Sequence, residues 1–141
     1  MKQLEALLTI FVIGVLIGLP AEIMRRRRLR TYWDRVCAGM DWRHAFPEAD
    51  KDNIRKYLQV FVDAFAFRNS TKLQFRPSDK IIDIYHACYP VKGWPDSLEL
   101  ETFAMMVEKT YHVDLAKEWN PEMTLGQVYT MTKRRGMPTK A

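Results

Sequence analysis

Residues 93–101 read GWPDSLELE, and this stretch divides the chain into its main structural parts. Its glycine and proline end the preceding segment, because neither residue readily continues a helix. Apolar residues then recur at helical spacing, which predicts a helix over residues 97–113. Asp96 and Glu99 fit the pattern of a capping box in the first turn. The stretch therefore predicts a turn that presents the hydroxyl of Ser97 at the start of a long helix.

The predicted helix over residues 97–113 has one apolar face and one charged face. We expect the apolar face to point into the core, and it comprises Leu98, Phe103, Met106, Val107 and either Thr110 or Tyr111. Most of the charged residues fall off that face, and they are Glu99, Glu101, Glu108 and Lys109. The surface of this helix is therefore predicted to be partly acidic.

Other helical patterns flank this one, and no segment of useful length alternates as a strand would. Ile54 to Phe65 is apolar at helical spacing, with Asp50 or Asp52 as the N-cap. The remaining patterns predict a short helix over 80–89 capped by Ser78 or Asp79, a short turn over 115–119, and a last helix from its Thr124 cap to 136. The predicted class is all-α, a small bundle with short connections.

The N-terminal end carries a membrane pattern. Residues 6–21 contain no charge and would rise roughly 24 Å as a helix, somewhat short of the roughly 30 Å hydrocarbon core. Five arginines follow the apolar run, namely Arg25, Arg26, Arg27, Arg28 and Arg30. Positive charge on this side predicts a retained single-pass anchor with the C-terminal part in the cytoplasm. A cleaved signal peptide is the rival, but it carries its charge before the apolar run and a small-residue site after it.

The predicted domains follow from these patterns. They are an anchor over 1–24, a basic and aromatic juxtamembrane segment over 25–46, a helical domain over 47–136 and a tail over 137–141. The five arginines are expected to set topology and to contact anionic lipid headgroups. The juxtamembrane aromatics either sit at the headgroup level or pack against the domain. Gly14 and Gly18 match the small-residue spacing of paired membrane helices, so a helix-pair dimer is a further expectation.

Charge distribution argues against nucleic acid as a partner. Residues 1–45 hold eight Lys/Arg against four Asp/Glu, whereas residues 46–132 hold ten against thirteen. The basic character therefore belongs to the two ends of the chain, and the middle is mildly acidic. A nucleic-acid-binding domain usually carries its positive charge on its own surface.

Other chemistry finds little support. Cys37 and Cys88 form no metal or redox motif and are expected to be free, buried thiols, although one disulfide stays open. The three histidines share no metal-ligand spacing, so no metal is expected. The glycines of a hydrolase nucleophile elbow are absent around Ser97. We therefore expect a protein that is not an enzyme.

Around Ser97 the chain resembles the acyl carrier proteins. The residues that carry the resemblance are Asp96-Ser97-Leu98, then Glu99-Leu100-Glu101, Met106-Val107-Glu108, Tyr111, Val113, Leu115 and Thr124-Leu125. In that family an Asp-Ser-Leu turn opens the second helix, which is acidic, and a Thr-Val or Thr-Leu pair opens the last one. The match runs from Asp96 to about Thr132 and extends back to Asn53. It is closest to membrane-anchored carrier-like proteins of bacteria, which implies the inner membrane.

The resemblance implies a fold and a function. The fold would be an acyl-carrier-like four-helix bundle behind one transmembrane helix. Ser97, flanked by Asp96 and Leu98, would receive 4′-phosphopantetheine from coenzyme A through a phosphopantetheinyl transferase, and the arm would hold an acyl group as a thioester. Acyl-transferring enzymes would dock on the following helix through Glu99, Glu101, Met105 and Glu108.

The chain also departs from the family pattern. It has an additional short helix before the turn, the bulky pair Trp94-Pro95 within the turn, and fewer acidic residues after it. These departures keep a second function open, in which the protein is an unmodified membrane-anchored helical adaptor that binds a protein partner.

Overall fold

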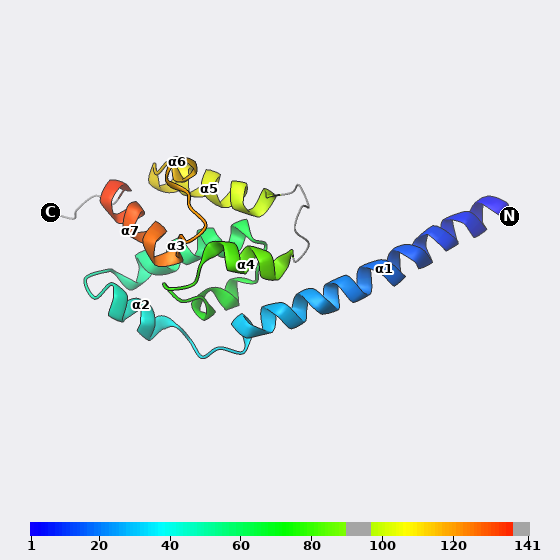
Figure 1. Ribbon diagram of the computed structural model, residues 1–141, viewed down its shortest axis with the longest axis horizontal. Coiled ribbons are helices and arrows are strands. Elements are labelled where there is room, and N and C mark those ends of the chain that lie inside the picture. The colour runs from blue at the N-terminus through cyan, green and yellow to red at the C-terminus, as the bar shows by residue number, and fades with distance from the viewer. Residues whose placement is uncertain (90–96, 137–141) are drawn as a thin grey trace.

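The structure is a computed structural model that describes residues 1–89 and 97–136, and most of these residues are helical (Figure 1). The predicted all-α class is confirmed, since the described residues contain no strand beyond one isolated bridge between Lys80 and Thr124. The elements are α1 (Lys2–Trp33), α2 (Gly39–Ala45), α3 (Lys51–Ala64), the 3₁₀ helix η1 (Asn69–Gln74), α4 (Ile81–Cys88), α5 (Leu98–Tyr111), α6 (Leu115–Glu118) and α7 (Leu125–Gly136).

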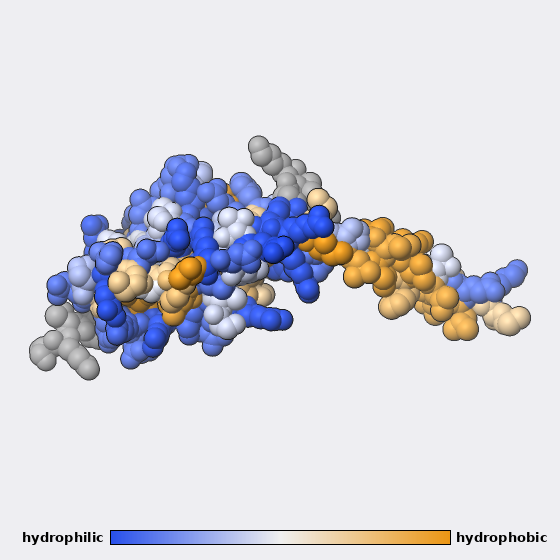
Figure 2. All heavy atoms as spheres, turned by 90° about the horizontal axis from the view of Figure 1, so that it is seen from below, coloured by the Kyte–Doolittle hydropathy of each residue, from blue (hydrophilic) through white to orange (hydrophobic). Residues whose placement is uncertain are grey.

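Helix α1 projects from the rest of the molecule as a rod whose apolar surface is uncovered (Figures 1 and 2). Its exposed large apolar side chains run from Leu4 to Met24, and those residues rise about 31 Å along the helix. This length matches the roughly 30 Å hydrocarbon core of a bilayer. Helix α1 is therefore long and apolar enough to cross a membrane. Gly14 and Gly18 lie on open helix surface, where an added Cβ would meet nothing within 4 Å.

The last turns of α1 belong to the core of the bundle. Leu29 is 3% exposed and Tyr32 is buried beside the ring of Phe75. Trp42 of α2 is also buried and donates its indole N–H to the carbonyl of Phe75 at 2.8 Å. Of the two placements open for the aromatics of 25–46, the structure shows packing against the domain. Residues on both sides of residue 46 therefore contribute to one hydrophobic core.

The centre of the bundle is helix α3, which packs against α5 on one side and η1 on the other. Its apolar residues recur at helical spacing, so one stripe of the helix is buried. Aromatic rings dominate this core, because Tyr57 and Phe61 of α3 meet Phe103 of α5 edge to face. The buried part of the stripe consists of Ile54, Tyr57, Leu58, Phe61, Val62 and Ala64.

Two predicted helix starts are confirmed in detail. Asp50 is the N-cap of α3, and its carboxylate accepts the backbone N–H of Asp52 at 3.1 Å. Thr124 and Gln127 form a reciprocal capping box at α7, in which each side chain accepts the other residue's backbone N–H, at 3.2 and 2.9 Å. The hydroxyl of Tyr57 then donates to the carbonyl of Leu125 at 2.9 Å and ties α3 to the start of α7.

The predicted cap of α4 is wrong, because Lys80 occupies the N-cap position and makes no side-chain cap. Asp79 is engaged elsewhere. Its carboxylate accepts the backbone N–H of Arg76 at 2.7 Å and pairs with Arg35 at 2.6 Å. Both Asp79 and Arg35 are largely buried, so their pairing and the turn it stabilises prevail over capping.

Two predicted burials are also wrong. Leu98 is 58% exposed, because it stands in the first turn of α5, outside the arc that faces α3. Cys37 is exposed in the connection between α1 and α2, whereas Cys88 is buried as expected, and both thiols are free. The structure also contains η1 where the sequence indicates only loop.

A left-handed residue ends α3. Ala66 has φ of 53° and stands just after the C-cap, where glycine is usual. The N–H groups of Ala66 and Phe67 donate back to the carbonyls of Asp63 at 3.2 Å and Val62 at 2.8 Å. These two bonds define a Schellman turn, which directs the chain from α3 into η1.

Candidate functional site

Ser97 occupies the N-cap position of α5, and its side chain makes no capping hydrogen bond to the backbone N–H groups of that helix. Its hydroxyl is partly exposed and donates instead to the carboxylate of Glu101 at 2.5 Å. The carbonyl of Ser97 accepts the N–H of Glu101 at 2.9 Å, which opens the helix. Asp96, predicted to cap α5 and to flank the attachment point, lies outside the described residues, as do Trp94 and Pro95.

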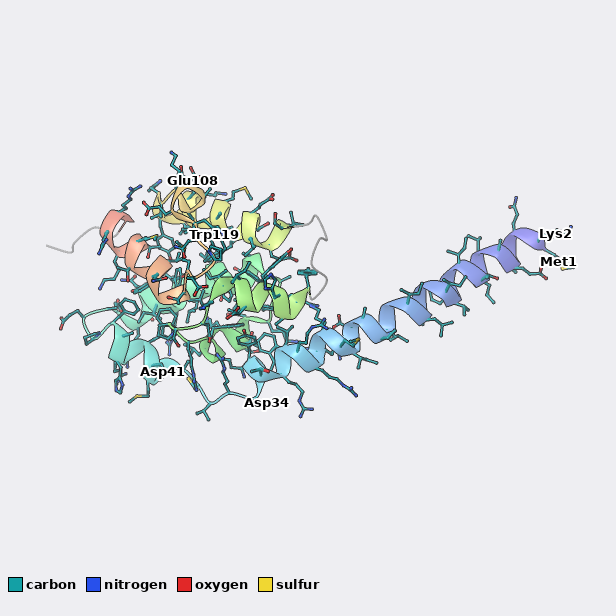
Figure 3. The ribbon with its side chains drawn as sticks, viewed as in Figure 1. Met1, Lys2, Asp34, Asp41, Glu108 and Trp119 are labelled. Carbon is teal, nitrogen blue, oxygen red and sulfur yellow. The ribbon has the colours of Figure 1, made fainter. Side chains whose placement is uncertain are left out.

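One exposed stripe runs along α5 from this point. Leu98, Glu101, Met105 and Glu108 are all exposed and lie three or four residues apart, so they share one face of the helix. Figure 3 shows Glu108 on the outer side of the bundle. The stripe combines two carboxylates with two large apolar side chains, of which Met105 is 61% exposed. Three of the four residues predicted to bind partners therefore lie side by side on this face.

Glu99, the fourth predicted partner residue, is engaged within the molecule. It accepts a hydrogen bond from the hydroxyl of Tyr89, the residue that follows α4. Burial, together with this hydrogen bond and the nearby Glu99 charge, raises the pKa of Tyr89 to about 12. The phenol thus stays protonated and keeps donating at any physiological pH. The bond joins the end of α4 to the first turn of α5 across residues 90–96.

The end of α4 is also held by α1. The Nε of Arg28 donates to the carbonyl of Ala87 at 3.1 Å, in the last turn of α4, where helix carbonyls lack partners. A cation here also faces the negative end of the α4 dipole. Burial raises the pKa of the adjacent Cys88 thiol to about 11, against the opposing effect of Arg25. Cys88 is therefore a protonated, packed thiol.

These contacts set the orientation of the Ser97 end of the bundle. Helix α4 ends and helix α5 begins on the side of the domain from which α1 projects (Figure 1). Since Arg28 follows the apolar span by only four residues, this side of the domain lies close to the end of the span. The structure thus brings Ser97 and the apolar part of α1 to the same side of the domain.

The five predicted headgroup arginines do not share one environment. Arg28 caps α4, and Arg25 is partly buried against Glu22 at 3.5 Å. The other three, Arg26, Arg27 and Arg30, are exposed. Arg26 and Arg30 make helical ion pairs with Glu22 at 3.1 Å and Asp34 at 3.3 Å.

The start of α5 is electrostatically favourable for an anion. The backbone N–H groups of the first turn and the positive end of the helix dipole would favour a phosphate ester on Ser97. Over residues 1–89 and 97–136, the partner of the Ser97 hydroxyl is the Glu101 carboxylate, and no histidine donates to or accepts from it as in a Ser-His-Asp triad. Attachment of a phosphate ester would break the hydrogen bond from Ser97 to Glu101. It would also bring the phosphate near the carboxylates of the first turn, Glu99 and Glu101, whose negative charge opposes part of the favourable effect of the helix N-terminus. Among the described residues, no group of His, Cys, Asp or Glu is placed to hold a metal ion.

Sequence reasoning missed the roles of Tyr89 and Arg28, because both depend on contacts between helices that are distant in sequence. In comparisons with known proteins, no family model, curated protein or solved structure matches the chain.

Proposed function

We propose that this chain is a membrane-tethered acyl carrier protein, which holds an acyl group as a thioester on a 4′-phosphopantetheine arm attached to Ser97. The observation that carries the proposal is the placement of that serine. It starts a 14-residue helix at the domain surface, its hydroxyl is not used as a backbone cap, and an exposed stripe of acidic and apolar residues begins beside it.

The packing around α5 supports the proposal further. Helix α3 packs against α5, which also contacts α6 and α7. In the proposed fold these four helices are the acyl-carrier bundle, and α4 is an additional helix that joins the bundle to the anchor. In that arrangement a phosphopantetheinyl transferase and acyl-transferring enzymes dock on the stripe of Leu98, Glu101, Met105 and Glu108.

The proposed location is the inner membrane, with a single pass and the bundle in the cytoplasm. Arginines at the end of the α1 span favour this orientation, since positive charge stays on the cytoplasmic side. Coenzyme A, the donor of the arm, is a cytoplasmic compound. A reporter enzyme fused after Ala141 should therefore show cytoplasmic activity, and periplasmic activity would overturn both the orientation and the modification.

The alternative is an unmodified adaptor that uses the same face of α5 to bind a protein partner. The exposure of Leu98 and Met105 favours it, because large apolar side chains grouped on one helix face are typical of interaction surfaces. This alternative needs no arm on Ser97.

Intact mass separates the two functions. The full chain is produced together with a competent phosphopantetheinyl transferase and extracted in a non-ionic detergent, and its intact mass is measured by mass spectrometry. The carrier gains the mass of one phosphopantetheine, and Ser97→Ala abolishes the gain. A chain that keeps its unmodified mass, although a known carrier is modified in the same cells, supports the adaptor.

A further inference from the structure

A cavity of about 620 Å³ lies between α1 and residues 66–74, which comprise the turn after α3 and η1. One wall is formed by residues 22–33 of α1, which comprise the last residues of the apolar span and the helical turns after it. The other wall is formed by residues 66–74, which the Schellman turn at Ala66 directs toward α1. Gln74 joins the two walls, because its side-chain amide donates to the carbonyl of Trp33 at 3.0 Å.

The cavity is strongly basic. Its lining includes five arginines against a single carboxylate, and the arginines are Arg25, Arg26, Arg27, Arg30 and Arg68. That carboxylate, Glu22, pairs with two of them, and Arg30 pairs with Asp34. Within residues 1–89 and 97–136, neither Arg27 nor Arg68 has an ion-pair partner, and both are exposed. The cavity therefore presents guanidinium groups that no carboxylate of the described chain neutralises.

The position of the cavity along α1 indicates which anion reaches it. The apolar span ends at Met24, and four of the five arginines of the cavity lie within the next six residues, about 9 Å along the helix. If the span crosses a bilayer, these residues lie at the depth of the phospholipid headgroups. Ile23, 51% exposed, lines the cavity at its lipid-side end. Figure 2 shows the hydrophilic surface of the domain meeting the apolar surface of α1.

We propose that this cavity binds the phosphate group of an anionic phospholipid. Guanidinium groups bind phosphate oxygens through paired, charge-assisted hydrogen bonds, which suits Arg27 and Arg68 on opposite walls. Ser70 also lines the cavity and carries a hydroxyl, whereas the hydroxyl of Thr71 donates to the carbonyl of Arg68 at 2.7 Å. Arg28 takes no part, because it caps α4. The proposal rests on the membrane-anchoring half of the proposed function and is independent of any modification of Ser97.

Such a site would do more than attract the domain to the membrane. The bound headgroup would bridge α1 and the segment 66–74, and both pack on the same core. It would therefore fix the angle between the anchor and the bundle, and with it the distance of Ser97 from the lipid surface. A net anionic lipid is favoured over a zwitterionic one, because the arginines of the cavity outnumber its carboxylate.

The test is a titration of the full chain in non-ionic detergent micelles with dihexanoyl phosphatidylglycerol, followed by amide NMR. We expect saturable shifts at residues 66–74. The double variant Arg27→Gln/Arg68→Gln should bind at least about tenfold more weakly, which corresponds to the loss of about 1.4 kcal/mol. The matched control is Arg134→Gln, which removes an exposed charge from α7 and should leave the affinity unchanged.

Three outcomes would overturn the proposal. Unchanged affinity in the double variant would show that the arginines do not bind the lipid. Equal affinity for dihexanoyl phosphatidylcholine would show that apolar adsorption is responsible. Inorganic phosphate that binds as tightly as the lipid would show a site for the free ion. Both replaced arginines are exposed, so the double variant should keep its fold, and its unchanged amide spectrum away from the cavity checks this. It should also still accept an arm on Ser97, so this proposal and the carrier function can fail separately.

Discussion

Two tyrosines in the core should respond with opposite signs to the same substitution. The hydroxyl of Tyr57 donates to the carbonyl of Leu125 at 2.9 Å, whereas the hydroxyl of Tyr129 is buried and has no hydrogen-bond partner among residues 1–89 and 97–136. Tyr57→Phe removes a hydrogen bond between α3 and α7 and should cost about 1 kcal/mol. Tyr129→Phe removes a hydroxyl that lost its hydration on folding without compensation, and should stabilise the protein by about 1 kcal/mol.

The two variants should therefore differ by about 2 kcal/mol, although each loses one oxygen atom from the same core. For a domain of this size, 1 kcal/mol shifts Tm by roughly 4 °C. Thermal unfolding in non-ionic detergent, followed by circular dichroism at 222 nm, measures both variants against the unchanged chain. Equal loss of Tm in the two variants would refute the reasoning, because Tyr129 would then have a hydrogen-bond partner in the folded protein.

Further predictions concern the packing of the last turns of α1 against the bundle, the effect of alkaline pH, and the turn after α3. Leu29→Ala should cost about 3 kcal/mol of unfolding free energy in detergent, because its side chain is buried, while Ile23→Ala in the exposed span should cost almost nothing. Burial, then Tyr111 and Asp50, raise the pKa of Tyr129 to about 12 from the usual value near 10. The unfolded state therefore loses the hydroxyl proton of Tyr129 at a lower pH than the folded state, so the contribution of Tyr129 to the unfolding free energy is constant below pH 10 and falls between pH 10 and 12; Tyr129→Phe should remove this part of the fall. Ala66→Gly should raise the unfolding free energy by about 0.5–1 kcal/mol, because the residue is left-handed; a loss would mean that the Schellman turn is not formed.

Most helices could be predicted from the sequence because the apolar residues of each helix recur at helical spacing on the face that is buried. The capping residues of α3 and α7 were also readable, since a cap depends on residues within one turn. The turn at Ala66 could not be predicted, because no glycine marks it, and η1 follows from that turn. The pairing of Asp79 with Arg35 could not be predicted either, since it joins residues 44 positions apart.

The candidate site also has some features that depend on local sequence and others that depend on packing between helices. Ser97 at the start of α5 and the exposed residues Glu101, Met105 and Glu108 follow from a local pattern and were predicted from the sequence, whereas Leu98 was predicted to be buried. The bond between Tyr89 and Glu99 and the cap of α4 by Arg28 depend on how α1, α4 and α5 pack. The separation of the arginines into those that face the bundle and those that are exposed has the same origin, because only the packed structure shows which face of α1 meets α4.

The central claim is that Ser97 carries the arm, and one reaction tests it most directly. The purified full chain in detergent is incubated with coenzyme A and a phosphopantetheinyl transferase, digested, and sequenced by tandem mass spectrometry. Ser78→Ala, which changes a serine outside α5, serves as the control for a nonspecific effect of the substitution. We predict that one phosphopantetheine maps to Ser97 in the unchanged chain and in Ser78→Ala, and that none is found in Ser97→Ala. An unmodified Ser97 in a reaction that fully modifies a known carrier would contradict the account.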